Sequence, residues 1–161
     1  MKTLYLIRHA KSDWYRGVED FERPLNKRGM SDAPKVGTFL KKEGMLPTEI
    51  ISSDANRAIS TARLIAKEVD FDLSKIEPIH NLYHASPKAM VSEIWNVSND
   101  CNSLFVFGHN PGISSLVDYL TEEMIDMKTC CVAKITFELD DWKAWVSGTG
   151  ILERLISPKE I

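Results

Sequence analysis

Apolar segments too short for a helix alternate along this chain with longer segments whose apolar residues recur at helical spacing. The short segments predict buried strands at residues 4–7, 49–52, 76–79 and 103–108. The longer segments predict helices at residues 25–45, 55–69, 86–97 and 111–120. Because such an alternation needs crossover connections, it predicts parallel strands with helices packed on both faces of a sheet.

The last third of the chain has a different pattern. Segments that run apolar or alternate around an Asp-Asp turn predict antiparallel strands at residues 130–139, 142–148 and 151–156. The whole chain therefore predicts a three-layer α/β/α fold, with a mostly parallel central sheet and antiparallel C-terminal strands.

Capping residues predict where two of the helices begin. Ser53 or Asp54 can cap the helix that follows the second strand, and Ser86 with Pro87 in the first turn is a strong start signal for the next. Pro34 fits its predicted helix only in the first turn or as a kink.

A chain of 161 residues, 43% hydrophobic and 27% charged, is long enough for one good core and short for two. We therefore expect a single domain over residues 1–161. The formal net charge of −3 gives no general attraction to nucleic acid, and the tryptophans do not form a basic aromatic stripe. We expect no nucleic-acid partner, and any anion site must be built from a few focused cations.

Three cysteines, two of them adjacent at Cys130 and Cys131, do not make a paired disulfide framework. Reduced thiols predict a cytoplasmic protein, and a reactive thiol stays a lesser alternative. The first apolar stretch ends at Arg8, which is too short for a signal sequence or a membrane span. We expect no membrane partner.

Basic side chains follow the ends of three predicted parallel strands. Arg8 and His9 end the first strand, Arg57 follows the second, and His109 follows the strand at 103–108. The carboxyl ends of parallel strands meet at one edge of a sheet, where ligand crevices lie. Guanidinium forks and imidazole donors suit a dianionic phosphoryl group. Taken singly, Arg57 is also compatible with an exposed helix charge and His109 with a helix cap.

Four motifs in combination resemble the histidine phosphatase superfamily, which has the phosphoglycerate mutase-like fold. They are RHAKSDW, DFERPLNKRG, SSDANRAISTA and FGHNPG. The short length and the RPLN segment are similar to the SixA-like phosphohistidine phosphatase branch, and the resemblance runs essentially end to end. RHA replaces the commoner RHG, and the small Ala10 should leave the backbone close to its usual path.

The resemblance implies that His9 is a nucleophile that becomes phosphorylated, and that Arg8, Arg57 and His109 hold the phosphoryl oxygens. It also implies substrate-binding roles for Arg23, Ser12 and Asn110. Many members place an acidic residue after the third strand as general acid. Here His84 stands nearest that position, and the alternatives are a loop role for His84 or an acid at Asp13 or Glu22.

No cofactor is needed for this chemistry, and we expect no metal site. His80 and His84 have the spacing of a helical ligand pair but fall in a predicted loop. Trp14 lies just past His9 and could reach the mouth of the pocket. Three functions stay open: a phosphatase acting on phosphohistidine in a partner protein, a phosphatase or mutase for small phosphorylated metabolites, and a non-catalytic phosphate-binding module.

Overall fold

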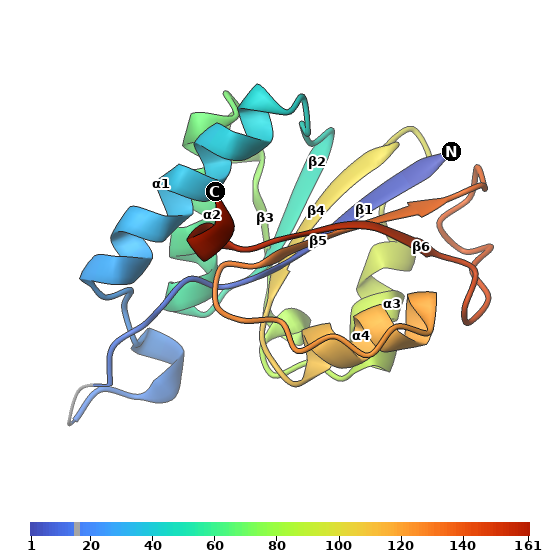
Figure 1. Ribbon diagram of the computed structural model, residues 1–161. Coiled ribbons are helices and arrows are strands. Elements are labelled where there is room, and N and C mark those ends of the chain that lie inside the picture. Colours follow the sequence, from blue (N-terminus) through green and yellow to red (C-terminus); the bar gives the residue numbers. More distant parts are fainter. Residues whose placement is uncertain (15–16) are drawn as a thin grey trace.

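The computed structural model describes residues 1–14 and 17–161. In this part of the chain the strands form one six-stranded sheet with the order β3-β2-β4-β1-β5-β6 (Figure 1). The strands are β1 (Lys2–Arg8), β2 (Glu49–Ser53), β3 (Glu77–Ile79), β4 (Ser103–Gly108), β5 (Val132–Phe137) and β6 (Ile151–Ile156). The first four are mutually parallel, and β5 pairs antiparallel with both β1 and β6.

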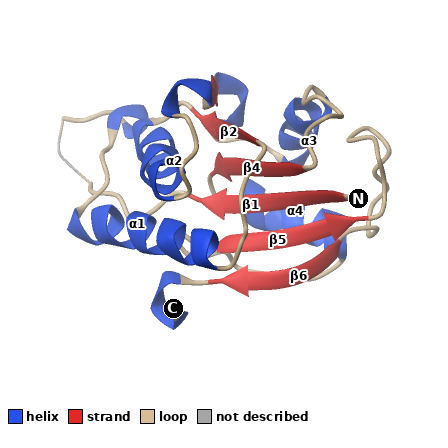
Figure 2. Ribbon diagram, turned by 90° about the horizontal axis from the view of Figure 1, so that it is seen from above, coloured by secondary structure: helices blue, strands red, loops and turns tan. Residues whose placement is uncertain are grey.

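Helices cover both faces of this sheet (Figure 2). One face carries α1 (Lys27–Lys42) and α2 (Asn56–Glu68), and the other carries α3 (Pro87–Trp95) and α4 (Gly112–Thr121). Short 3₁₀ turns lie in three connections, η1 (Asp20–Glu22), η2 (Leu73–Lys75) and η3 (His80–Leu82), and a fourth, η4 (Pro158–Glu160), follows β6. The predicted three-layer, mostly parallel α/β fold is therefore confirmed. The expectation of a single domain stays a prediction.

Strand β1 shows why the sequence folds into three layers. Successive side chains of a strand point to opposite faces, and Tyr5 and Ile7 join the core under α1 and α2, whereas Leu4 and Leu6 join the core over α3 and α4. Because both faces are covered by helices, β1 is apolar at every central position and shows no alternation in its sequence.

Two local predictions were wrong. Helix α2 has Ala55 as its N-cap without a side-chain cap; Ser53 Oγ accepts from the Ala55 amide (3.2 Å), one step too early to cap the helix. Residues 142–148 form turns and not a strand. There Trp142 is buried, with its indole N–H bonded to the Cys101 carbonyl (2.9 Å), and Trp145 stacks on Phe137. Both rings pack against the core, and this segment does not pair with the sheet as a strand.

The start signal at Ser86 was confirmed. Ser86 Oγ accepts from the Ala89 amide (3.2 Å) and caps α3, with Pro87 in its first turn. Asn26 caps α1 by accepting from the Gly29 amide. Pro34 lies inside α1, beyond the first turn. Within the described residues, no helix is both long and apolar enough to cross a membrane.

Candidate active site

A pocket of about 250 Å³ lies at the carboxyl edge of the parallel strands. Strands β1 and β4 are neighbours in register there, so that Arg8 lies opposite Gly108 and the His9 amide donates to the Gly108 carbonyl (3.1 Å). This pairing brings the two histidines that follow the strands together. The pocket is lined by Arg8, His9, Lys11, Ser12, Trp14, Asp20, Arg23, Arg57, His84, His109, Asn110 and Thr129.

The lining includes all eight site residues predicted from sequence, and Trp14 at the rim. Lys11, Asp20 and Thr129 were not predicted. Asp13 and Glu22, the alternative acids, are absent from the lining within the part of the chain that the structure describes. A place in the pocket lining does not by itself make His84 an acid or His9 a nucleophile; the protonation state of each group decides its role.

His9 is held as a neutral imidazole with a defined tautomer. It is 6% exposed, and Nδ1 lies 2.7 Å from the carbonyl of Ala10. A carbonyl can only accept, so Nδ1 carries the proton and Nε2 keeps a lone pair. Burial, reinforced by Arg57, Arg8 and Arg23, lowers the pKa of His9 to about 3. His9 is therefore unprotonated at Nε2 at neutral pH and can attack an electrophile there.

His109 lies beside His9, with ring centroids 5.2 Å apart. Burial, together with the neighbouring His9 and Arg57, lowers the pKa of His109 to about 3. Nε2 of His109 and Ser53 Oγ share a hydrogen bond (2.8 Å), and Ser53 already accepts from the Ala55 amide. The Ser53 hydroxyl is free to donate to Nε2, and in that arrangement the proton of His109 lies on Nδ1. Nδ1 is buried and has no partner among the described residues.

The arginines also present buried N–H groups without protein partners. Nε of Arg8 and Nε of Arg57 have none among the described residues, although Arg8 donates to the Met127 carbonyl (3.0 Å). Arg57 is 2% exposed because α2 begins at the pocket and turns its first residues inward. Buried donors of this kind are costly unless a ligand satisfies them. Together with Nδ1 of His109 they form a set suited to the oxygens of a phosphoryl group.

Asp20 is the functional residue that sequence reasoning missed. Its carboxylate accepts from Arg23 Nε (3.0 Å), Arg57 (3.0 Å), the Tyr83 hydroxyl (2.5 Å) and His84 Nε2 (3.1 Å). Its backbone carbonyl accepts from Arg57 as well (2.7 Å). The one sequence signal was its position three residues before Arg23 in the DFER segment, where η1 turns both side chains the same way.

The ionisation state of Asp20 decides which groups can give a proton. Burial raises its pKa, but hydrogen bonds from Tyr83, Arg23 and Arg57 outweigh burial and hold the pKa well below its usual range. Asp20 is therefore a carboxylate and an acceptor. His84 Nε2 donates to it and so carries a proton, and the left-handed backbone of His84 (φ 51°) turns this imidazole toward the pocket.

The predicted substrate-binding residues already make hydrogen bonds within the protein. Arg23 donates to Ser12 Oγ (2.8 Å), and its guanidinium lies 3.6 Å above the ring of the exposed Trp14. Asn110 holds the loop after β4: its amide group donates to the Met127 carbonyl (2.8 Å), and its oxygen accepts from Ser114. Met127 thereby positions both Arg8 and Asn110 through one carbonyl.

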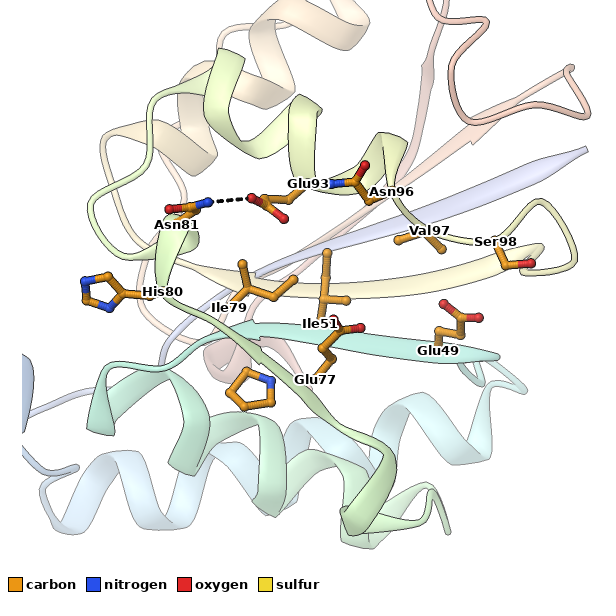
Figure 3. A pocket seen from close by; sticks show the side chains of 11 residues that line it. Glu49, Ile51, Glu77, Ile79, His80, Asn81, Glu93, Asn96, Val97 and Ser98 are labelled. Atoms are coloured by element: carbon orange, nitrogen blue, oxygen red, sulfur yellow. Dashed lines mark hydrogen bonds between the residues drawn. The ribbon is translucent and has the colours of Figure 1, made fainter.

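No cluster of three or more metal-ligating side chains occurs within residues 1–14 and 17–161. His80 pairs with Asp54 (3.0 Å), whereas His84 pairs with Asp20 (3.1 Å). A second hollow of about 430 Å³ opens between β2, β3 and α3 (Figure 3). Glu49, Glu77 and Glu93 line it. Burial, with the nearby carboxylates of Glu77 and Asp100, raises the pKa of Glu49, and a lining with three glutamates and neither lysine nor arginine does not suit a phosphate.

Comparison with known proteins identifies the family. The model of the histidine phosphatase superfamily, branch 1, matches residues 4–84, half of the chain. A chloroplastic protein of Arabidopsis thaliana, itself uncharacterized, is 32% identical, and the alignment covers 98% of this chain and 78% of the plant protein. The chain therefore belongs to the histidine phosphatase superfamily and is an enzyme of the histidine phosphatase type.

Solved structures show the same fold. The protein histidine phosphatase SixA, complexed with tungstate, superposes with a TM-score of 0.84 at 20% identity over 98% of both chains. A 2,3-bisphosphoglycerate-dependent phosphoglycerate mutase of Erythrobacter litoralis is 39% identical over 75 residues, which cover 44% of this chain and 32% of the mutase. The alignment thus spans only about a third of that mutase, whereas the superposition on SixA spans nearly the whole of both chains.

Proposed function

We propose that the protein is a phosphatase that removes a phosphoryl group from phosphohistidine in a partner protein, through a covalent intermediate on His9. One observation carries the proposal: the Nε2 lone pair of a neutral, buried His9 lies in one pocket with Arg8, Arg57 and His109, each of which has a buried side-chain nitrogen without a partner among the described residues. This is the combination that phosphoryl transfer needs, a nucleophile free to attack in line and donors already in place for the equatorial oxygens.

The reaction has two steps. Nε2 of His9 attacks phosphorus, the P–N bond to the substrate imidazole breaks, and the P–Nε2 bond forms. Water then attacks the phosphorus of phospho-His9, the P–Nε2 bond breaks, and inorganic phosphate leaves. The cationic donors need no reorganisation in either step because the fold holds them in place, Arg57 through two hydrogen bonds to Asp20.

The departing imidazole takes up a proton, and His84 is the proposed donor. Asp20 is ionised and has none to give, whereas His84 lines the pocket beside the Asp20 carboxylate and, as an imidazolium, gives one proton and becomes a neutral imidazole. A phosphohistidine leaving group departs easily and needs little acid assistance, which suits a site with an exposed imidazole where many relatives have a carboxyl group. Alkyl phosphates need more acid assistance, because an alkoxide is a poor leaving group.

The choice of substrate is supported by the likeness to SixA, a protein histidine phosphatase whose complex contains the oxyanion tungstate. The mutase match favours a second candidate, a phosphatase or mutase for small phosphorylated metabolites. A mutase must also hold a second phosphate or a carboxylate of its substrate, besides the phosphoryl group that is transferred. Beyond the phosphoryl donors, the pocket offers two further cations, Lys11 and Arg23, and Arg23 is already bonded to Asp20 and Ser12.

A substrate panel tests the proposal. Purified protein is incubated with a phosphohistidine peptide, phosphoramidate, an aryl phosphate, a sugar phosphate and a phosphoglycerate, and phosphate release and isomerisation are measured. We expect kcat/KM for the phosphohistidine peptide to exceed that for the sugar phosphate by at least about a hundredfold, because a sugar alkoxide is a far poorer leaving group than imidazole and depends much more on proton transfer from His84. Higher turnover of the sugar phosphate would favour the second candidate, and isomerised phosphoglycerate a mutase.

A further inference from the structure

A groove on the protein surface continues the catalytic pocket away from His9. A hollow of about 310 Å³ between the beginnings of α3 and α4 shares His84, His109 and Asn110 with the pocket. A further hollow of about 620 Å³ shares Ser86 and Pro87 with that one. The two hollows together are called the interhelical groove below. His84 stands where the groove joins the pocket.

The fold explains the direction of the groove. Both α3 and α4 begin at the carboxyl edge of the sheet, α3 after His84 and α4 after His109, and run side by side away from it (Figure 1). Pro87, Val91 and Trp95 line the groove from α3 at intervals of four residues, and Ser115 and Tyr119 line it from α4 at the same interval. A rise of 1.5 Å per residue takes the groove about 12 Å from Pro87 to Trp95.

The outer part of the groove is apolar and open. Trp95 is 42% exposed and Tyr119 is 45% exposed, which is unusual for two large aromatic rings on neighbouring helices. Lys88 is the one charged side chain that lines this outer part, among the residues that the structure describes. The character of the surface therefore changes along its length, from cationic donors at His9 to uncharged side chains at Trp95.

Length and chemistry decide what fits both ends at once. A sugar phosphate or phosphoglycerate fills the pocket but does not extend a further 12 Å. A groove between two parallel helices accepts a third helix through ridges and grooves of side chains. An occupant with a phosphohistidine at one end and apolar side chains two helical turns away contacts the pocket and the two aromatic rings together.

We propose that the interhelical groove binds an amphipathic helix of the phosphohistidine-bearing protein, with apolar side chains against Trp95 and Tyr119 and an acidic side chain near Lys88. The proposal rests on the proposed function, and it names the part of the partner that the enzyme recognises. It also places His84 between the pocket and the groove, on the side by which the dephosphorylated imidazole leaves.

Two peptides and two enzymes test it. One helical peptide carries a phosphohistidine and leucines seven and eight residues along the same face, and its partner has serines in place of the leucines. The enzymes are the wild type and the Trp95→Ala/Tyr119→Ala variant. We expect the wild type to prefer the leucine peptide by about tenfold or more in kcat/KM, through KM, because buried aromatic anchors carry most of the binding energy of such contacts.

The variant should lose that preference while it hydrolyses the serine peptide and phosphoramidate at wild-type rates. Met30→Ala removes an exposed apolar side chain from α1, on the opposite face, and should keep the preference. Lys88→Glu is a second variant that leaves both rings in place, and it should lower kcat/KM for a leucine peptide with an acidic residue. If the wild type turns over both peptides with equal kcat/KM, the groove does not bind the helix as proposed. If it turns over neither peptide, the proposed function is wrong.

Discussion

Each end of strand β1 carries a basic side chain that the fold largely covers, and the two are satisfied in opposite ways. Lys2, 1% exposed, donates to the Asn99 carbonyl (2.5 Å), the Cys101 carbonyl (2.9 Å) and Asn102 Oδ1 (2.9 Å). These are all three donors of its ammonium group. Arg8 donates to one carbonyl, and its Nε is buried without a described partner.

The difference separates a structural cation from a binding one. A buried charge with all its hydrogen bonds made inside the protein fixes the local fold. Buried donors without a partner have lost their hydrogen bonds to water and have made none within the protein. They are therefore expected where a ligand accepts those hydrogen bonds. Three of the four such atoms among the described residues belong to Arg8, Arg57 and His109 in the pocket, and the fourth is Trp145 Nε1. Nothing in the structure explains the fourth.

The largest expected effect is at His9. His9→Ala removes the proposed nucleophile, and turnover should fall by on the order of ten-thousandfold or more while the melting temperature changes little. Acid-quenched wild-type protein should carry a phosphoryl group on His9 after incubation with labelled substrate. His80→Ala removes an exposed histidine from η3 and should leave both signals unchanged. Robust turnover by His9→Ala would exclude the covalent mechanism.

His84→Ala tests the proton donor. Loss of acid catalysis should slow an alkyl phosphate by on the order of a hundred- to ten-thousandfold, and an aryl phosphate or phosphoramidate much less, because only a poor leaving group needs the proton in the transition state. The measurement is kcat/KM across a leaving-group series. An equal loss for every substrate would show that His84 shapes the loop and donates no proton.

Arg57→Ala removes one of the open donors. We expect kcat/KM to fall by on the order of a hundred- to a thousandfold, and vanadate or tungstate to bind more weakly, because a donor preorganised for the phosphoryl oxygens is lost. Arg63→Ala changes an exposed arginine of the same helix and serves as the control. If both variants bound vanadate as tightly as the wild type, Arg57 would not be part of the anion site.

Lys2→Met should give the opposite result. It removes the donor to the Asn99 carbonyl and to Asn102 Oδ1, so the free energy of unfolding should fall by about 1–3 kcal/mol while kcat/KM stays within twofold. Urea unfolding measures the first quantity. The exposed Lys67→Met on α2 should change neither. A loss of activity without a loss of stability would remove the contrast between the two ends of β1.

The smallest effect is the pH dependence of stability. Folding lowers the pKa of His9 and of His109 to about 3, so below their unfolded value the unfolded chain binds more protons than the native one. The free energy of unfolding should therefore fall as the pH falls, by about 1 kcal/mol between pH 6 and 5 for each histidine.

Urea titrations above pH 4.5 measure this slope without the protonation of Asp20, whose pKa folding also lowers. His9→Asn and His109→Asn should each flatten it, and His80→Asn should not. An unchanged slope in both active-site variants would mean that neither histidine is held neutral by burial.

Much of the fold follows from local patterns. The strand at 103–108 and the strand at 151–156 begin and end where the pattern of apolar residues predicts. The buried run before Arg8 and the apolar face of α2 follow from periodicity as well. Hydrophobic periodicity is a local property, and a parallel sheet brings the carboxyl ends of its strands together, so the convergence of Arg8, His9, Arg57 and His109 could be predicted before any contact was known.

Only the tertiary structure decided the rest, because it depends on contacts between residues distant in the chain. Asp20 enters the pocket because η1 packs against α2, and its partners Arg57 and Tyr83 lie 37 and 63 positions away. Trp142 lies in a turn and not in a strand because its indole N–H donates to the Cys101 carbonyl and its ring packs in the core. The interhelical groove exists because α3 and α4 begin at neighbouring points of one sheet edge, which no pattern within either helix encodes.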